Sequence, residues 1–280
     1  MMPAMNACAV FERLSETLPE LGLDAYFGVF TRYARTFYTG DADHDFHLDL
    51  KVEHSRNVFT HALAIAGAED AFLSDAARRR ALLLAALFHD FGRFKQFALY
   101  GTFSDPQSVN HALLAVTELK RLRIFEREET RIRHLAMAGI VLHNRFAIPA
   151  TVKADARAVT TAVRDADKLD IMRVMASYLT VEGPVDPVIA LHAIDSPEVT
   201  PAVLAAVTNR RLGRYGDLRT TTDFKLLVCG WLYDLNYPSS RRMAVKGGHL
   251  AAILASLPDT DALRPFAAMF RHDLAAHASA

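Results

Sequence analysis

The chain has 280 residues, of which 51% are hydrophobic and 23% charged, and its 32 Lys and Arg balance its 32 Asp and Glu. This balance excludes the strong basic field with which proteins bind nucleic acids or anionic membranes. The two cysteines, Cys8 and Cys229, are too few for a disulfide framework and lack zinc-ribbon spacing. With no secretory signal and no apolar run of membrane-spanning length, we expect a soluble, cytoplasmic protein.

The chain is predicted to be a succession of helices. Apolar residues recur at helical spacing, whereas few segments alternate with a period of two or cluster β-branched residues, so strands are essentially absent. The expected fold class is therefore all-α. In chain order, helices are expected at residues 8–39 (one or two helices, broken near 19–22), 50–66, 75–91, 109–122, 126–144, 152–179, 201–212, 221–235, 239–256 and 260–277.

Two polar stretches are expected to connect these helices. Residues 40–49 are acidic and predict a loop that caps the next helix, with a metal site around His44 and His47 as the less favoured alternative. Residues 94–107 contain Gly, Asp and Pro and also predict a loop. Gly92 is expected to end a helix or form a tight turn.

A single helical domain is expected, divided into three parts. Residues 1–47 are expected to pack N-terminal helices on the core, residues 48–180 to form a metal-binding core, and residues 181–280 to form a helical extension. The extension carries no recognisable motif. We expect it to close a pocket or to mediate a homodimer.

The apolar run at residues 81–88 ends in two adjacent polar residues, His89 and Asp90. Such a run predicts a deeply buried helix, where polar side chains are costly unless a charged partner satisfies them. A divalent metal ion is a suitable partner, because imidazole and carboxylate groups are its common ligands. A helix end that emerges into solvent is the alternative interpretation of this stretch alone.

Further candidate ligands lie on other helices. His54 and Asp167 each belong to a helix with a buried face, and together with His89 and Asp90 they suffice for one octahedral site with open positions. Adjacent side chains at a helix end point about 100° apart, so both can reach one ion, or the carboxylate can bridge two. A second ion could be held by two histidines near helix termini, His111 and His143.

The order of these residues and their surroundings resembles the HD-domain superfamily of metal-dependent phosphohydrolases. The resemblance covers about residues 48–180, and its motifs are specific in combination, although a lone His-Asp dipeptide is not. The matching stretches are LKVEHS (50–55), LFHDFGRF (87–94), GTFSDPQSVNH (101–111) and RDADKLD (164–170).

The resemblance implies an HD-like helical bundle that binds one or two divalent ions, drawn from Mn, Fe, Mg, Zn, Ni or Co. Asp90 would bridge the ions when two are present. His-Asp-x-Gly is followed by Lys in the related cyclic-dinucleotide phosphodiesterases, which also carry Gly-Tyr-Pro. Here the position holds Arg93 and Gly-Tyr-Pro does not occur, which argues against a cyclic dinucleotide substrate. The implied ligands are His54, His89, Asp90 and Asp167 for the first ion and His111 and His143 for the second.

The expected activity is hydrolysis of a small phosphorylated metabolite or nucleotide by a metal-activated water. Asp90, Arg93 and Lys168 are the expected catalytic residues. Arg93 is the first candidate for a phosphate clamp because its planar fork suits phosphate oxygens, followed by Arg145 and Gln96. For each of these side chains the alternative is a structural role, in a salt bridge or as a surface charge.

Two other functions fit the same residues. The six expected ligands also resemble those of di-iron HD-domain oxygenases, which differ in metal identity and redox use rather than in ligands. A non-catalytic nucleotide-binding regulator is less favoured, because every expected ligand is present.

Overall fold

The computed structural model describes residues 21–180 and 194–278, and every regular element in these ranges is helical. The one β interaction among them is an isolated bridge between Ile194 and Thr220. The predicted all-α class is therefore confirmed. The α-helices are α2 (Asp24–Arg35), α3 (Ala42–Ala68), α4 (Asp70–Leu73), α5 (Ala76–Phe88), α6 (Phe91–Tyr100), α7 (His111–Arg121), α8 (Thr130–Leu142), α9 (Ala154–Leu179), α10 (Pro201–Thr208), α11 (Thr221–Gly230), α12 (Pro238–Lys246), α13 (His249–Ala255) and α14 (Arg264–Ala278), and the 3-10 helices are η1 (Asp105–Gln107), η2 (Tyr215–Asp217) and η3 (Trp231–Asp234).

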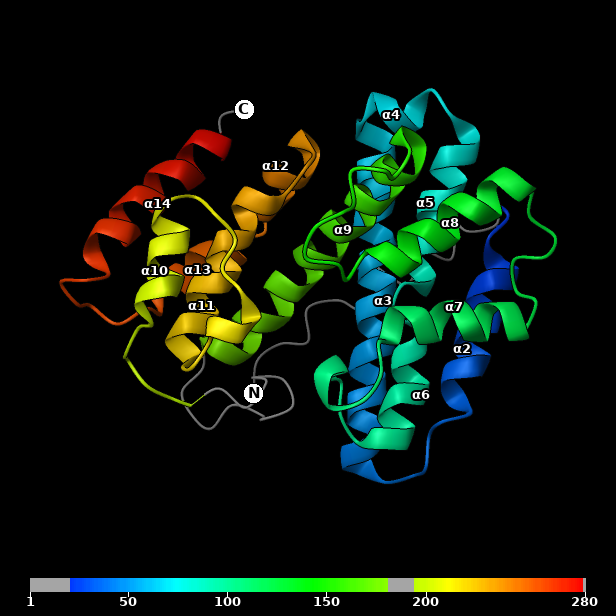
Figure 1. Cartoon of the computed structure of the whole chain (residues 1–280), viewed down its shortest axis with the longest axis horizontal. Helices are drawn as coiled ribbons and strands as arrows, with labels where there is room; N and C mark the ends of the chain where they lie inside the picture. The colour runs from blue at the N-terminus through cyan, green and yellow to red at the C-terminus, as the bar shows by residue number, and fades with distance from the viewer. Residues whose placement is uncertain (1–20, 181–193, 279–280) are drawn as a thin grey trace.

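Helix α9 runs between two groups of helices (Figure 1). Helices α2 to α8 lie on one side, and α10 to α14 lie on the other. Each group has its own hydrophobic core: the first includes α9 as far as Ala166, and the second takes up the same helix from Leu169. Because one helix contributes to both cores, residues near the middle of α9 lie where the two groups meet.

Helix α5 is the centre of the first core. Its N-cap Asp75 accepts a hydrogen bond from the Arg78 backbone N–H at 2.9 Å, and every residue from 81 to 88 is buried. A helix that is apolar on all sides is stable only inside a protein, and α5 packs against α3, α8 and α9. Its C-terminal end, with the polar residues that follow, therefore lies in the interior.

Residues 42–49 form the first turns of α3, so the predicted connecting loop is wrong. The Asp41 side chain caps the helix by accepting the His44 backbone N–H at 2.8 Å. Asp45 accepts the backbone N–H groups of Thr39 and Gly40, each at 2.9 Å. The acidic residues were interpreted as loop, but near a helix N-terminus they stabilise the helix. As a result, α3 continues unbroken across the expected boundary at residues 47 and 48.

Residues 91–100 form α6, where a loop was predicted from residue 94 onward. Phe91, Phe94 and Phe97 recur at three-residue intervals and are all buried, which is the pattern of a helix packed on the core. Gly101 ends the helix with a φ of 62°, a left-handed conformation that glycine adopts without strain. The residues that indicated a loop, Gly101, Asp105 and Pro106, come after the last residue of α6.

The helix expected at 239–256 is divided into α12 and α13. Gly248, with a φ of 71°, separates them. The remaining helices were predicted with ends displaced by a few residues. The part of the 8–39 prediction before residue 21 lies outside the described residues, whereas α2 agrees with the rest.

Asp165 on α9 fastens the C-terminal helices to the core. Its buried carboxylate accepts the backbone N–H of Asn236 at 2.8 Å, the Asn236 side-chain amide at 2.8 Å and the backbone N–H of Tyr237 at 3.0 Å. Leaving such donors without a partner costs about 1–3 kcal/mol for each buried group. This anchor holds η3, which ends at Asp234, close to the middle of α9.

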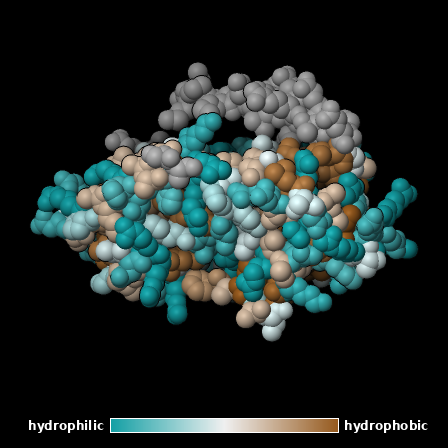
Figure 2. Space-filling view, turned by 90° about the horizontal axis from the view of Figure 1, so that it is seen from above, coloured by the Kyte–Doolittle hydropathy of each residue, from teal (hydrophilic) through white to brown (hydrophobic). Residues whose placement is uncertain are grey.

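The face of the molecule in Figure 2 mixes hydrophilic and hydrophobic residues without a continuous apolar band. Within residues 21–180 and 194–278, no helix combines the length and hydrophobicity needed to cross a membrane.

Candidate metal centre

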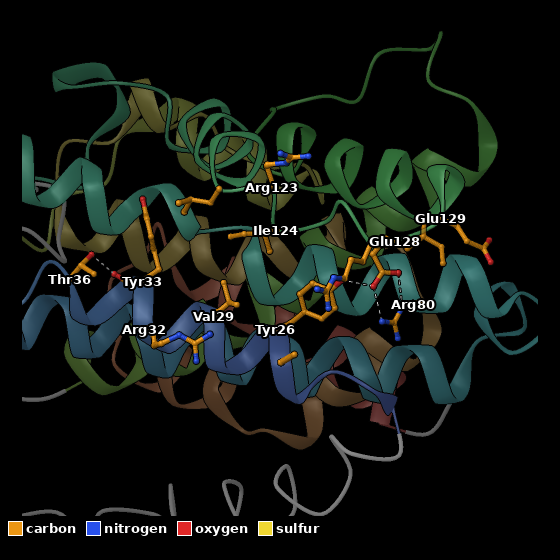
Figure 3. Close-up of a pocket in the computed structure, with 14 residues that line it drawn as sticks. Tyr26, Val29, Arg32, Tyr33, Thr36, Arg80, Arg123, Ile124, Glu128 and Glu129 are labelled. Carbon is orange, nitrogen blue, oxygen red and sulfur yellow. Dashed lines mark hydrogen bonds and ion pairs between the residues drawn. The ribbon is translucent and has the colours of Figure 1, made fainter.

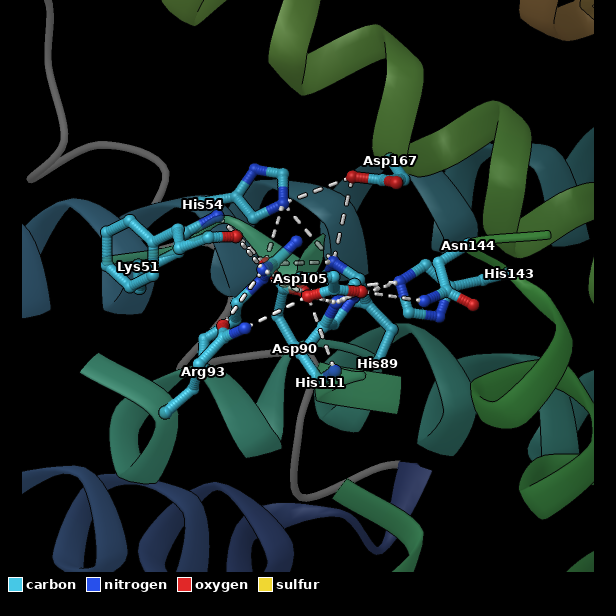
Figure 4. A network of polar contacts seen from close by, with 12 residues as sticks. Lys51, His54, His89, Asp90, Arg93, Asp105, His111, His143, Asn144 and Asp167 are labelled. Atoms are coloured by element: carbon cyan, nitrogen blue, oxygen red, sulfur yellow. Dashed lines mark hydrogen bonds and ion pairs between the residues drawn. The ribbon is translucent and has the colours of Figure 1, made fainter. Parts of the chain in front are cut away.

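All six expected ligands meet in the interior between α3 and α9 (Figure 4). The four histidines and Asp90 are buried, and the Asp167 side chain is 19% exposed. Each comes from a different position along the helices: His54 from within α3, His89 from the C-cap of α5, Asp90 from the N-cap of α6, His111 from the first turn of α7, His143 from the C-cap of α8 and Asp167 from within α9.

Gly92 explains why His111 reaches this centre. A Cβ atom at Gly92 would lie 2.2 Å from the His111 carbonyl oxygen and 2.7 Å from the Ala115 nitrogen. No side chain larger than hydrogen is compatible with this approach, so α6 and α7 contact each other through the glycine. Gly92 was expected to end a helix or to form a tight turn; instead it lies within α6 and allows the close packing of α7.

The histidines form two pairs. The Nε2 atoms of His54 and His89 are 3.2 Å apart, and those of His111 and His143 are 3.1 Å apart. We call the first pair with Asp167 the first half of the centre, and the second pair the second half. Asp167 belongs to the first half because its Oδ1 lies 3.2 Å from His54 Nε2 and 3.7 Å from His89 Nε2.

Asp90 lies between the two halves. Its Oδ2 is 3.7 Å from His54 Nε2 and 3.8 Å from His89 Nε2, whereas its Oδ1 is 3.3 Å from His111 Nε2 and 4.0 Å from His143 Nε2. One oxygen therefore faces each pair, which is the arrangement of a carboxylate that can bridge two cations.

The opposite nitrogen of every histidine in the centre has an acceptor. His54 Nδ1 contacts Asp170 at 2.7 Å and His111 Nδ1 contacts Asp105 at 2.8 Å. These contacts require Nδ1–H donors, so each Nε2 points its lone pair into the centre when its ring is neutral. The other two donate to carbonyl oxygens three residues earlier: His89 to Ala86 at 2.8 Å and His143 to Ile140 at 2.7 Å.

The second half provides the clearest test of whether a cation fits. Burial lowers the pKa values of His111 and His143 to about 4, so both rings are neutral near pH 7. Two buried lone pairs that face each other at 3.1 Å have no proton to share, because both Nδ1 atoms carry the ring hydrogens. A cation bound by both nitrogens and by Asp90 would satisfy this arrangement, and imidazole with carboxylate suits Zn, Fe, Mn, Co or Ni.

The neighbouring charges set the protonation states of Asp90 and His54, and they keep the Asp90 carboxylate ionised, as a metal ligand requires. Burial by itself would raise the pKa of Asp90, but Lys51, His89 and Arg93 hold it well below its usual range. Burial opposes protonation of His54, yet hydrogen bonds to Asp167 and Asp170 raise its pKa to about 9. In the metal-free protein the first half thus holds a proton where a metal ion would bind, as expected for ligands whose metal binding releases protons.

The four expected substrate-contacting residues lie in different environments. Arg93 lines the cavity over the centre, but its guanidinium donates to Asp90, Gln96, Asp105 and the Phe103 carbonyl. Gln96 is fully buried, donates to Asp105 and Ser108, and does not line this cavity. Lys168 lines the cavity and pairs with Asp234 at 2.9 Å. Arg145 is exposed on the cavity wall, and its guanidinium makes no ion pair or hydrogen bond with any described residue.

Four further polar residues at the centre were missed by the sequence reasoning. Lys51 donates to Asp90 Oδ2 at 3.0 Å, and it lies one helical turn before His54, so helical spacing could have identified it. Asp105 and Asp170 lie within stretches that were recognised, but their contacts with Nδ1 atoms depend on the fold. Arg164 donates to the His143 carbonyl at 3.2 Å and pairs with Asp234 at 3.2 Å.

A cavity of about 500 Å³ opens over the centre. Lys51 and five of the six ligand residues, all except His89, line it. Three residues of the C-terminal region also line it: Leu212, Tyr215 and Trp231. The C-terminal region therefore contributes to the walls of the cavity.

A second hollow, of about 870 Å³, lies between α2, α5 and the connection from α7 to α8 (Figure 3). Arg80 and Glu128 pair across it with hydrogen bonds of 2.7 and 2.8 Å, and Tyr26 donates to Glu128 at 2.6 Å. None of the predicted site residues lines it.

The histidines outside the centre that the structure describes do not join it. His44 and His47 pack near Phe97 and belong to none of the His/Cys/Asp/Glu groups close enough to hold a metal among the described residues. His61 is partly buried, and burial lowers its pKa to about 4, consistent with a core histidine.

Comparison with known proteins gives one match. The HD domain family model matches residues 52–172, a range that contains all six expected ligands. No curated protein and no solved structure matches the chain.

Proposed function

Residues 52–172 match the HD domain family, and we propose that the chain is a metal-dependent phosphohydrolase of this superfamily with a binuclear centre. HD domains bind divalent metal ions and are typically hydrolases of phosphate esters, and the His/Asp cluster has the residues to hold such ions. The proposed substrate is a small phosphorylated metabolite or nucleotide.

The observation that carries this proposal is the position of Asp90 between two histidine pairs whose Nε2 atoms converge. The proposed ligands of the first ion are His54, His89, Asp90 and Asp167, and those of the second are Asp90, His111 and His143. Bound divalent ions would lower the pKa of a water molecule and neutralise charge on phosphate oxygens.

The cations of the cavity support a phosphate ester as the substrate. Lys51, Arg145, Arg164 and Lys168 all line it. Arg164 and Lys168 share Asp234, which offsets part of their charge, whereas Arg145 has no such partner among the described residues. We propose that the Arg145 guanidinium binds phosphate oxygens, since its planar fork can donate two hydrogen bonds at once.

Arg93 is proposed to position other groups rather than to bind phosphate. Its guanidinium lies 3.3 Å from Asp90 Oδ1 and 3.0 Å from Asp105 Oδ1. It thereby connects Asp90, which lies between the two halves, with Asp105, which orients His111. Lys51 and Arg93 approach different oxygens of Asp90, so together they fix the rotation of its carboxylate.

The experiment that tests the proposed function is hydrolysis of p-nitrophenyl phosphate by the purified, metal-loaded protein under anaerobic conditions. Turnover without oxygen is expected, with metal content of up to two ions per chain. A protein that turns over only with oxygen would contradict the proposal and favour the di-iron oxygenase.

Lys168→Met should lower kcat/KM less than Arg145→Met, because Asp234 already neutralises Lys168.

A further inference from the structure

Two large aromatic side chains remain exposed at the cavity over the metal centre. Phe146, just after α8, is 60% exposed, and Tyr215, in η2, is 53% exposed. Both line the same cavity although they lie far apart in the sequence and belong to opposite groups of helices. Aromatic rings that a fold leaves exposed around a concave site commonly contact a ligand.

The neighbouring Phe103 shows what a ring at this cavity looks like when the protein itself uses it. Phe103 stacks on Phe97 with ring centroids 4.7 Å apart, and Lys51 lies 5.0 Å from its ring centroid. Phe146 and Tyr215 make no ring contact with another aromatic side chain of the described residues. Their faces are therefore available to a ligand, whereas that of Phe103 is not.

Resting on the proposed phosphohydrolase function, we propose that the leaving group of the substrate carries a planar ring that packs against Phe146 and Tyr215 while the phosphate lies at the metal centre. The cavity of about 500 Å³ is within the range that holds a small-molecule ligand. Trp231, only 3% exposed, forms part of the wall on the side of Tyr215. The substrate class is thus a phosphate ester whose alcohol or phenol carries a planar ring, rather than an open-chain phosphate or a sugar phosphate without such a ring.

The position of Tyr215 supports this assignment. Its side chain lines the cavity together with the ligand Asp167, and 53% of its surface stays accessible. Tyr215 can therefore offer its ring to the substrate and a hydrogen-bond donor at the same time.

The test compares two phosphate esters of a ribose 5′-hydroxyl group that differ only at the anomeric carbon: adenosine 5′-monophosphate, which carries the planar adenine ring there, and methyl ribofuranoside 5-phosphate, which carries a methoxy group. We expect kcat/KM to be at least about tenfold higher for the ring-bearing ester, as stacking of a base on an aromatic side chain commonly provides. The difference should lie in KM, because the ring contact is the same in the ground state and the transition state.

Variants identify the residues responsible. Phe146→Ala and Tyr215→Ala should each reduce the preference several-fold, and the double variant should abolish it, while Tyr215→Phe keeps most of it. Tyr100→Ala is the matched control, since Tyr100 is an aromatic residue 47% exposed on α6 that does not line the cavity. A preference that survives the double variant would overturn the assignment.

A binding measurement separates this inference from the proposed activity. Trp231 is the only tryptophan of the chain, so intrinsic fluorescence reports on this cavity. Adenosine should change the emission in a saturable manner and bind more weakly to the double variant, whereas methyl ribofuranoside should bind weakly to both. If neither these esters nor p-nitrophenyl phosphate is hydrolysed, the proposed function fails, and this titration alone tests whether the cavity binds a planar ring. If both esters are hydrolysed equally and adenosine has no effect, the ring inference is wrong and the hydrolase stands.

Discussion

The two halves of the metal centre hold their histidines by related but unequal means. In each half, one histidine lies at a helix C-cap and donates Nδ1–H to a carbonyl, and the other donates to a carboxylate. The carboxylate of the first half, Asp170, is fully buried in α9 and is itself held by Arg173 at 2.7 Å. That of the second half, Asp105, is 25% exposed and lies in the short η1 helix between α6 and α7.

The halves also differ in negative charge and in rigidity. Asp167 has its closest contacts in the first half, at 3.2 Å from His54 Nε2 and 3.7 Å from His89 Nε2, although one of its oxygens also lies within 4.8 Å of a His143 ring nitrogen. The nearest carboxylate that faces the Nε2 atoms of the second half is the shared Asp90. The first half is supported by α3 and α9, of 27 and 26 residues, whereas His111 begins the 11-residue α7. More carboxylate charge and longer supporting helices lead us to expect tighter metal binding in the first half.

The largest effect is expected from Asp90→Asn, which removes the charge that both halves share. Metal content measured by mass spectrometry should fall in both halves, and kcat/KM should fall by well over about 100-fold, since even residues that only orient metal ligands contribute about 10- to 100-fold. Circular dichroism serves as the folding control. A folded variant that retains two ions would contradict the bridging position.

Two matched variants, His54→Gln and His143→Gln, should differ in metal content and activity, because each removes a ligand from a different half of the centre. His143→Gln should leave one ion per chain, bound in the first half, because the first half contains none of the altered atoms. His54→Gln should lower the affinity of the tighter half, so metal content should fall further and activity more. Equal metal loss in both variants would show that the halves do not bind independently.

Gly92→Ala should disturb the second half selectively. The added methyl would lie 2.2 Å from the His111 carbonyl oxygen, so α7 must move away from α6. We expect loss of the second ion and destabilisation of about 1–3 kcal/mol, as for other overpacked sites, measured by denaturant unfolding. Gly216→Ala is a control in open space. A Gly92→Ala protein with full metal content would argue that His111 is not positioned through this contact.

The smallest effects are expected from the carboxylates that orient the histidines. Asp170→Asn and Asp105→Asn should each lower the metal affinity of their own half by about 10- to 100-fold. The loss of affinity in Asp170→Asn should lie near the upper end of this range, because the substitution also leaves the buried His54 ring and Arg173 without their anion. Competition with a metal chelator would measure both. If Asp105→Asn reduces only the affinity of the first half, the proposed division of the centre is wrong.

Much of the helical fold could be predicted because periodicity is a local property. The run at residues 81–88 is apolar throughout, and α5 is correspondingly buried on all sides. The predictions failed where local signals had two meanings. The acidic stretch was predicted to be a loop that caps the next helix; Asp41 does cap α3, but residues 42–49 belong to the helix, and Gly101 indicated a loop but ends α6.

The sequence by itself determined the all-α class and the set of polar residues at the buried helix ends, because these follow from residue type, periodicity and a family resemblance. Only the tertiary structure decided which histidines pair, since that depends on contacts such as the one between Gly92 and His111. It also decided that Arg93 contacts protein carboxylates, and that Tyr215 and Trp231 reach the cavity over the centre. These relations join residues far apart in the chain, so no local pattern could encode them.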